Sequence, residues 1–108
     1  MTLPSSASPS LASSAIVERE GRYLLVRRSR PPSAAMYAFP GGRAEPGETP
    51  AETALRELKE ETGLTGRDAT LFASYDLPPL TIDGPTTRHF FLSVFRVVGP
   101  SMVSGGRS

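Results

Sequence analysis

Residues 42–64 read GRAEPGETPAETALRELKEETGL. The run begins as a glycine-rich loop broken by proline and continues as a predicted helix that carries Glu57, Glu60 and Glu61. Residues three and four apart are neighbours on a helix, and each like-charge pair there destabilises an isolated helix by roughly 0.2–0.5 kcal/mol. Carboxylates that gather beside a glycine-rich turn therefore indicate a divalent cation and phosphate as ligands.

The ends of the predicted helix are marked by capping residues. Thr49 suits the N-cap, Pro50 suits the first helical position, and Glu52 completes a capping box. Gly63 is expected to end the helix in the left-handed conformation. The side chains expected to dock the helix share one arc: Ala51, Ala54, Leu55, Leu58 and Thr62.

The helix glutamates lie at the edge of this apolar arc, where a cleft would form. Glu57 and Glu61, four residues apart, can converge on one magnesium ion. Glu60 can ligate a second ion or act as a general base.

The loop before the helix has residues suited to hold it near a metal or a phosphate. Arg56 faces away from the apolar arc and can pair with Glu48, which would fix the loop against the helix. Gly41 and Gly42 let the backbone approach a metal or a phosphate closely.

The rest of the chain is expected to form strands and turns. Strands are predicted over residues 15–17, 23–26, 38–39, 71–75 and 89–98, with a short one possible at 80–82. A hairpin turn is expected at residues 20–21, and a loop over 29–37 contains Pro31 and Pro32. His89 is assigned no catalytic role, and Tyr37 and Phe39 are assigned to core packing rather than base stacking.

The bulk composition indicates one globular domain. The chain has 108 residues, of which 38% are hydrophobic and 21% charged. It has no cysteine, which excludes disulfides and thiolate metal sites and favours the cytoplasm. Its net charge of +1 predicts no stable nucleic-acid complex, and no apolar run is long enough for a membrane span. We expect a flexible leader over residues 1–12, a domain over 13–99 and a flexible tail over 100–108.

The loop and helix together resemble the Nudix hydrolase family, whose box is G-x5-E-x7-R-E-U-x-E-E-x-G-U with U a bulky aliphatic residue. Phe39, Pro40 and Gly41 also resemble the usual lead-in of the family. The box takes up 23 of the 108 residues. Its specified positions are filled by Gly42, Glu48, Arg56, Glu57, Leu58, Glu60, Glu61, Gly63 and Leu64.

The resemblance implies an α/β fold, an α/β/α sandwich around a mixed β-sheet. It implies hydrolysis of a nucleoside diphosphate linked to another group, as in nucleotide-sanitising (MutT-like) and ADP-ribose-cleaving members. Mg²⁺, or Mn²⁺ in its place, would be held by Glu57, Glu60, Glu61 and the backbone of Gly42.

The resemblance also implies catalytic and substrate-binding roles. One of the metal-ligating glutamates or a glutamate elsewhere would be the general base, so Glu60 and Glu61 are candidates, with Arg56 orienting a glutamate. The backbone of Gly41 would approach the substrate. Arg27 and Arg28 resemble a basic pair that reaches substrate phosphate or base, although ordinary surface charge would also explain them.

The chain is shorter at its C-terminus than the family pattern, in which a second long helix covers the other face of the sheet. We expect that helix to be missing and an apolar sheet face to be exposed. A truncated gene, a homodimer that supplies the missing layer, and a minimal variant each explain the difference. The alternative to a hydrolase is a catalytically weak binding or regulatory module with the same fold.

Overall fold

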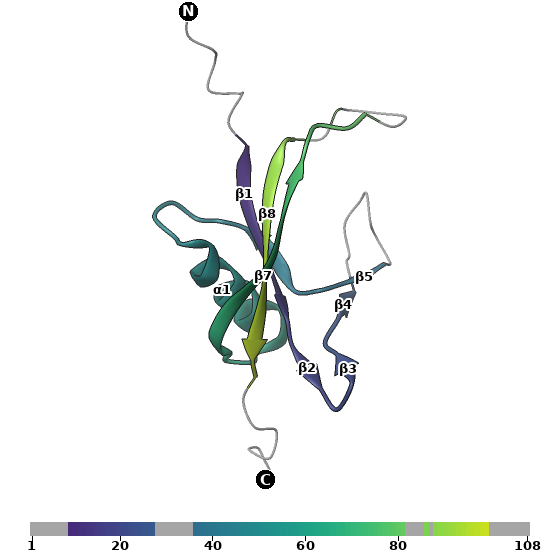
Figure 1. Ribbon diagram of the computed structural model, residues 1–108, viewed down its shortest axis with the longest axis vertical. Helices are drawn as coiled ribbons and strands as arrows, with labels where there is room; N and C mark the ends of the chain where they lie inside the picture. Colours follow the sequence, from purple (N-terminus) through teal and green to yellow (C-terminus); the bar gives the residue numbers. More distant parts are fainter. Residues whose placement is uncertain (1–8, 28–35, 82–85, 87, 100–108) are drawn as a thin grey trace, which may run out of the picture.

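A mixed four-stranded sheet carries one helix on one of its faces in the computed structural model, which describes residues 9–27, 36–81, 86 and 88–99 (Figure 1). The strand order is β6-β1-β8-β7. β1 runs parallel to β8, whereas β6 and β7 are antiparallel to their neighbours. The elements are β1 (Ser10–Ile16), β6 (Gly41–Arg43), α1 (Pro50–Thr62), β7 (Arg67–Leu77) and β8 (Phe90–Val98). The predicted α/β fold with a mixed sheet is confirmed.

Two short hairpin-like pairs lie beside the main sheet, on the side away from α1 in Figure 1. The first pairs β2 (Glu18–Arg19) with β3 (Arg22–Tyr23), and the second pairs β4 (Val26–Arg27) with β5 (Tyr37–Ala38). The predicted turn is confirmed, since Glu20 and Gly21 both have positive φ.

The single strand predicted over 23–26 is wrong. The structure divides this segment between β3 and β4, with Leu24 and Leu25 in neither strand. The Leu24 amide still donates to the carbonyl of Val17, and its side chain packs against the core.

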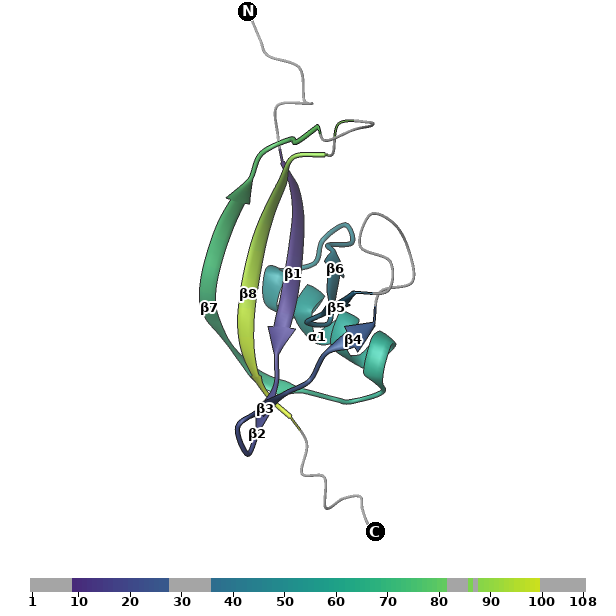
Figure 2. The ribbon, with the colours of Figure 1, turned by 90° about the vertical axis from the view of Figure 1, so that its right-hand side faces the viewer.

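The helix has the predicted ends. The Thr49 side chain accepts from the Glu52 amide, the Glu52 carboxylate accepts from the Thr49 amide, and Gly63 closes the helix at φ 81°. The predicted arc docks on the sheet, where the core consists of Ala15, Val17, Ala54, Leu58, Phe95 and Val97. Figure 2 shows α1 crossing behind the main strands. The described part of the chain contains no helix long and apolar enough to span a membrane.

Residues 10–12, predicted to be part of a flexible leader, lie in a strand instead. Residues 10–12 belong to β1 and pair with residues 90–92 of β8, and the Ser10 amide donates to the carbonyl of His89 at 2.8 Å. Ser10 and Ala12 have little strand propensity of their own, so this part of the strand forms through its neighbour. Residues 1–8 and the expected tail lie outside the described residues.

The sheet edge formed by β7 exposes apolar side chains, as expected. Leu71, Phe72, Tyr75 and Leu77 are all exposed there. β7 is also longer than the predicted 71–75, whereas Leu80 lies outside any strand and Ile82 lies outside the described residues.

Candidate active site

Arg56 ties the glycine-rich loop to α1 through Glu48, as predicted. Its Nε donates to Glu48 Oε2 at 2.5 Å, and its Nη2 donates to Glu48 Oε1 at 3.1 Å and to the carbonyl oxygen of Arg43 at 3.0 Å. This two-point fork matches the plane of the carboxylate, so it fixes the loop in direction as well as in distance.

Glu48 is held in its charged form. Its side chain is only 15% exposed, and its Oε1 also accepts from the Thr53 hydroxyl at 2.7 Å and the Glu45 amide at 2.9 Å. The hydrogen bonds from Arg56, followed by that from the Glu45 amide, lower the pKa of Glu48 from 4.5 to about 2. The same pairing raises the pKa of Arg56 further above its usual range. Both groups therefore keep their charges over the whole physiological range.

The remaining nitrogen of Arg56, Nη1, contacts two carboxylates of the helix, those of Glu57 and Glu60. Its Nη1 donates to Glu57 Oε2 at 3.0 Å and to the two oxygens of Glu60 at 3.2 and 3.3 Å. Glu45 Oε2 lies 3.7 Å from the same nitrogen. Together with Glu48, four glutamates therefore surround Arg56: Glu45, Glu48, Glu57 and Glu60.

The two glycines before the loop meet different neighbours. A methyl group on Gly42 would overlap the carboxylate of Glu57. A methyl group on Gly41 would lie 2.5 Å from the carbonyl oxygen of Ser13 and 2.7 Å from the hydroxyl of Ser14. Gly42 therefore makes room for a predicted metal ligand, whereas Gly41 makes room for strand β1.

The donor set fits a hard divalent cation in its chemistry. Carboxylate oxygens are the ligands that Mg²⁺ and Mn²⁺ prefer, and the space beside Gly42 admits the Glu57 carboxylate next to the backbone. Among the described side chains no three acids or histidines are arranged as a metal site, and Glu57 and Glu60 both accept hydrogen bonds from Arg56. Glu61 is exposed on the same helix. Ligation by Glu57, Glu60 and Glu61 stays a prediction.

A hollow of about 580 Å³ lies beside this loop. It is lined by Gly41, Gly42 and Arg43 together with aromatic side chains. Tyr37 is one of them and is 67% exposed, so the prediction that it packs in the core is wrong. Phe39 also lines the hollow, at its partly exposed edge, and packs edge-on against Tyr23 at 6.2 Å between ring centroids.

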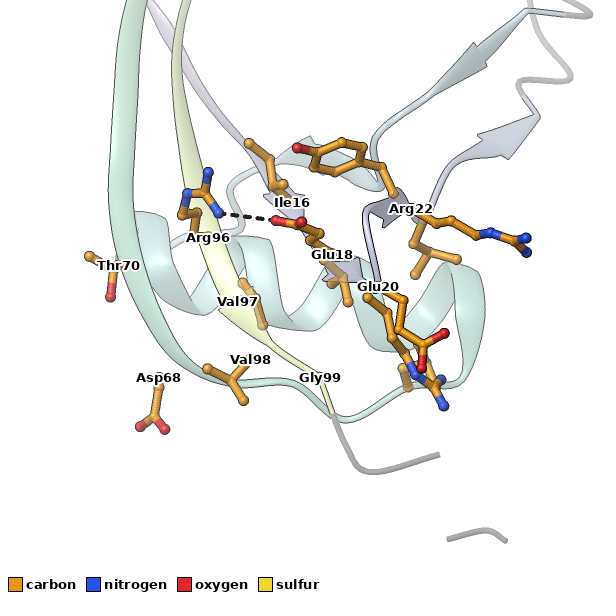
Figure 3. A pocket seen from close by; sticks show the side chains of 15 residues that line it. Ile16, Glu18, Glu20, Arg22, Asp68, Thr70, Arg96, Val97, Val98 and Gly99 are labelled. Atoms are coloured by element: carbon orange, nitrogen blue, oxygen red, sulfur yellow. Dashed lines mark ion pairs between the residues drawn. The ribbon is translucent and has the colours of Figure 1, made fainter. Parts of the chain in front are cut away.

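A larger hollow, of about 850 Å³, lies where β1 and β8 end (Figure 3). Glu18 and Arg96 approach each other across it at 3.6 Å, and Tyr23 and Val98 belong to its lining. None of the predicted site residues that the structure describes lines it. The smaller hollow includes the Gly42 backbone, against which the Glu57 carboxylate lies, so of the two it is the one next to the predicted site.

Of the predicted substrate-binding pair, Arg27 and Arg28, the structure describes only Arg27. Arg27 is exposed in β4 and lines neither hollow, and Arg28 lies outside the described residues. Their contact with substrate stays a prediction.

Two contributors to the site were missed in the sequence. Thr53 is fully buried and its hydroxyl donates to Glu48, and the backbone amide of Glu45 donates to the same carboxylate. Thr53 had a signal, since it falls between the apolar positions of the arc in the first turns of the helix. Glu45 had none, because its contact depends on the fold of the loop.

Comparison with known proteins assigns this chain to a family. The sequence pattern of the NUDIX domain matches residues 9–105. The chain is 34% identical over 97 residues to an ADP-ribose pyrophosphatase of Methanocaldococcus jannaschii, covering 90% of this chain and 56% of that protein. It is 37% identical over 62 residues to a CTP pyrophosphohydrolase of Escherichia coli (strain K12), covering 56% of this chain and 46% of that protein.

A solved structure supports the same relationship. A NUDIX hydrolase from Nitrosomonas europaea superposes with a TM-score of 0.73 at 27% identity, covering 86% of this chain and 48% of that one. The chain spans about half the length of these relatives. Because the family pattern matches most of the chain, the chain belongs to the NUDIX domain family.

Proposed function

We propose that this member of the NUDIX family hydrolyses a phosphoric anhydride bond in a nucleoside diphosphate linked to another group. The products would be a nucleoside monophosphate and a phosphorylated second product. The observation that carries the proposal is the complete box, with Glu57 seated against Gly42 and Arg56 fixing the loop beside it. The similarity to an ADP-ribose pyrophosphatase and a CTP pyrophosphohydrolase supports ADP-ribose or a nucleoside triphosphate as substrate.

The proposed metal is Mg²⁺, with Mn²⁺ able to replace it. Glu57, Glu60, Glu61 and the backbone of Gly42 would hold it. When bound, such an ion neutralises phosphate oxygens and lowers the pKa of a water molecule. Glu60 and Glu61 are the candidates for the general base.

The protein's own residues position the reacting groups. The Arg56 fork holds Glu48 and the Arg43 carbonyl, so the loop beside the phosphates is fixed before substrate arrives. In the smaller hollow, the exposed faces of Tyr37 and Phe39 offer stacking surfaces for a nucleobase. Arg27 and Arg28 are proposed to reach substrate phosphate.

Hydrolysis assays with a panel of substrates test this function. ADP-ribose and the nucleoside triphosphates are incubated with the chain and Mg²⁺, and released phosphorylated products are separated by chromatography. Glu60→Gln and Glu61→Gln are compared with Glu18→Gln, which removes the same charge near the larger hollow. We expect at least one of the first two to lower the rate about 100-fold or more, the usual range for a lost acid–base group, and Glu18→Gln to leave it unchanged.

Two results would count against the proposal. If neither Glu60→Gln nor Glu61→Gln altered hydrolysis, these glutamates would not be the catalytic groups. If the folded wild-type chain bound nucleotides but turned over none of the panel, the chain would be a binding or regulatory module.

The remaining expectations about the chain stay predictions. They are a cytoplasmic location, no stable complex with nucleic acid, no membrane association, and a possible homodimer. Size-exclusion chromatography with light scattering would decide the last.

A further inference from the structure

The guanidinium of Arg56 has two edges with different surroundings. Nε and Nη2 form one edge, which contacts Glu48 at 2.5 and 3.1 Å and the Arg43 carbonyl at 3.0 Å. The Glu48 side chain is nearly buried, and its other bonds come from Thr53 and the Glu45 amide. This anchored edge belongs to the structure of the loop, since breaking it would leave a shielded carboxylate without its main partner.

The other edge, Nη1, has more carboxylate oxygens near it than it has hydrogens to donate. It has two hydrogens but lies within 3.7 Å of four carboxylate oxygens, which belong to Glu57, Glu60 and Glu45. The Glu60 side chain is 56% exposed and that of Glu45 is also well exposed, so water screens these contacts. The Nη1 contacts to Glu60 and Glu45 are therefore easier to exchange than those of the anchored edge. Glu57 is 15% exposed, as Glu48 is, but Arg56 holds it through one hydrogen bond of 3.0 Å rather than through two.

We propose that Nη1 of Arg56 is a placeholder cation for the metal. It neutralises Glu57 and Glu60 in the metal-free protein and gives them up when a divalent cation binds. Nε and Nη2 keep their bonds to Glu48 and Arg43 throughout. The inference rests on the proposed function, because Glu57 and Glu60 are the metal ligands of that proposal.

The placeholder role and a purely orienting role predict opposite changes in metal affinity when Arg56 is replaced. If Nη1 competes with the metal, Arg56→Gln removes a positive charge from the ligand carboxylates and raises metal affinity, on the order of tenfold for a like charge at this range. Glu48→Gln weakens the anchored edge and leaves the full cation on Glu57 and Glu60, so metal affinity falls several-fold. If Arg56 only oriented the ligands, both substitutions would weaken binding.

Titration with Mn²⁺ alone measures this without reference to activity. Free Mn²⁺ is followed by its electron paramagnetic resonance signal in the wild-type chain, Arg56→Gln and Glu48→Gln. Arg88→Gln is the matched control, since it removes one arginine charge outside the predicted site, from a side chain that donates to the Ser10 hydroxyl at 3.3 Å. We expect tighter binding by Arg56→Gln, weaker binding by Glu48→Gln and no change in the control.

The outcomes separate this inference from the function it rests on. A wild-type chain that bound Mn²⁺ while Arg56→Gln bound it less tightly would overturn the placeholder and leave the proposed function intact. A folded wild-type chain that bound no Mn²⁺ would overturn the metal-dependent function and the placeholder with it.

A second measurement covers the case in which Arg56→Gln does not fold. In ¹H–¹⁵N spectra of the wild-type arginine side chains, saturating Mg²⁺ should shift the Nη1 resonances of Arg56 and leave its Nε resonance in place. Unchanged Nη1 resonances at saturation would overturn the placeholder.

Discussion

Replacing Gly42 with alanine would put a methyl group where the Glu57 carboxylate lies. The Glu57 side chain is only 15% exposed and its Oε2 accepts from Arg56 at 3.0 Å, so the carboxylate can yield only by leaving its place beside the loop. Overpacking of this kind destabilises a protein by about 1–3 kcal/mol. That corresponds to a fall in melting temperature of roughly 4 °C for each kcal/mol or somewhat more in a domain of this size.

The larger effect of Gly42→Ala should fall on the site. Displacement of a catalytic group by about 1 Å lowers rates roughly 100-fold, so we expect a folded protein with that loss in hydrolysis and with weakened Mn²⁺ binding. Thermal unfolding, Mn²⁺ titration and hydrolysis are measured on the same preparation.

Two other glycines serve as controls for Gly42→Ala. Gly21→Ala has open space for its methyl group but a φ of 78°, so it should destabilise the fold by about 1 kcal/mol and leave the site intact. Gly41→Ala collides with the backbone of β1 and should damage the fold itself. A Gly42→Ala protein with wild-type hydrolysis and Mn²⁺ affinity would refute the claim that this glycine makes room for Glu57.

Three further predictions concern stability. The lowered pKa of Glu48 stabilises the fold above its ordinary pKa of 4.5, and this contribution is lost as the pH falls toward about 2. The difference in urea stability between wild type and Glu48→Gln should therefore shrink over that range, and a constant difference would contradict it. Leu58→Ala leaves a cavity at a fully buried core position and should lower the free energy of unfolding by about 2–5 kcal/mol. A loss below about 1 kcal/mol would contradict this. Thr49→Ala removes the helix N-cap and should lower the free energy of unfolding by about 1 kcal/mol in the same assay. No change would mean that the cap is dispensable.

The helix was predictable because its signals are local. Thr49, Glu52 and Gly63 act within one turn of the residues they cap, and the docking arc follows from the period of the helix. The Arg56–Glu48 pair was predictable for a related reason, since Arg56 lies on the helix face away from the apolar arc and Glu48 lies in the loop just before the helix.

Strand β1 and the hollow beside the loop were not predictable in full. Ser10 and Ala12 are weakly strand-forming, and this segment is a strand because β8 supplies hydrogen-bond partners. Tyr37 looked like a core residue because it is aromatic, but it lies in a short strand paired with β4, and its side chain is 67% exposed.

The sequence alone determined the helix, its caps, the set of carboxylates and the family to which they belong, because these depend on residue type and spacing along the chain. Tertiary structure decided how the set is arranged. It put Glu57 against Gly42, set Gly41 on strand β1, and shared one nitrogen of Arg56 among three glutamates. These contacts join the loop, the helix and the sheet, and their distances arise only when the three pack together around one core.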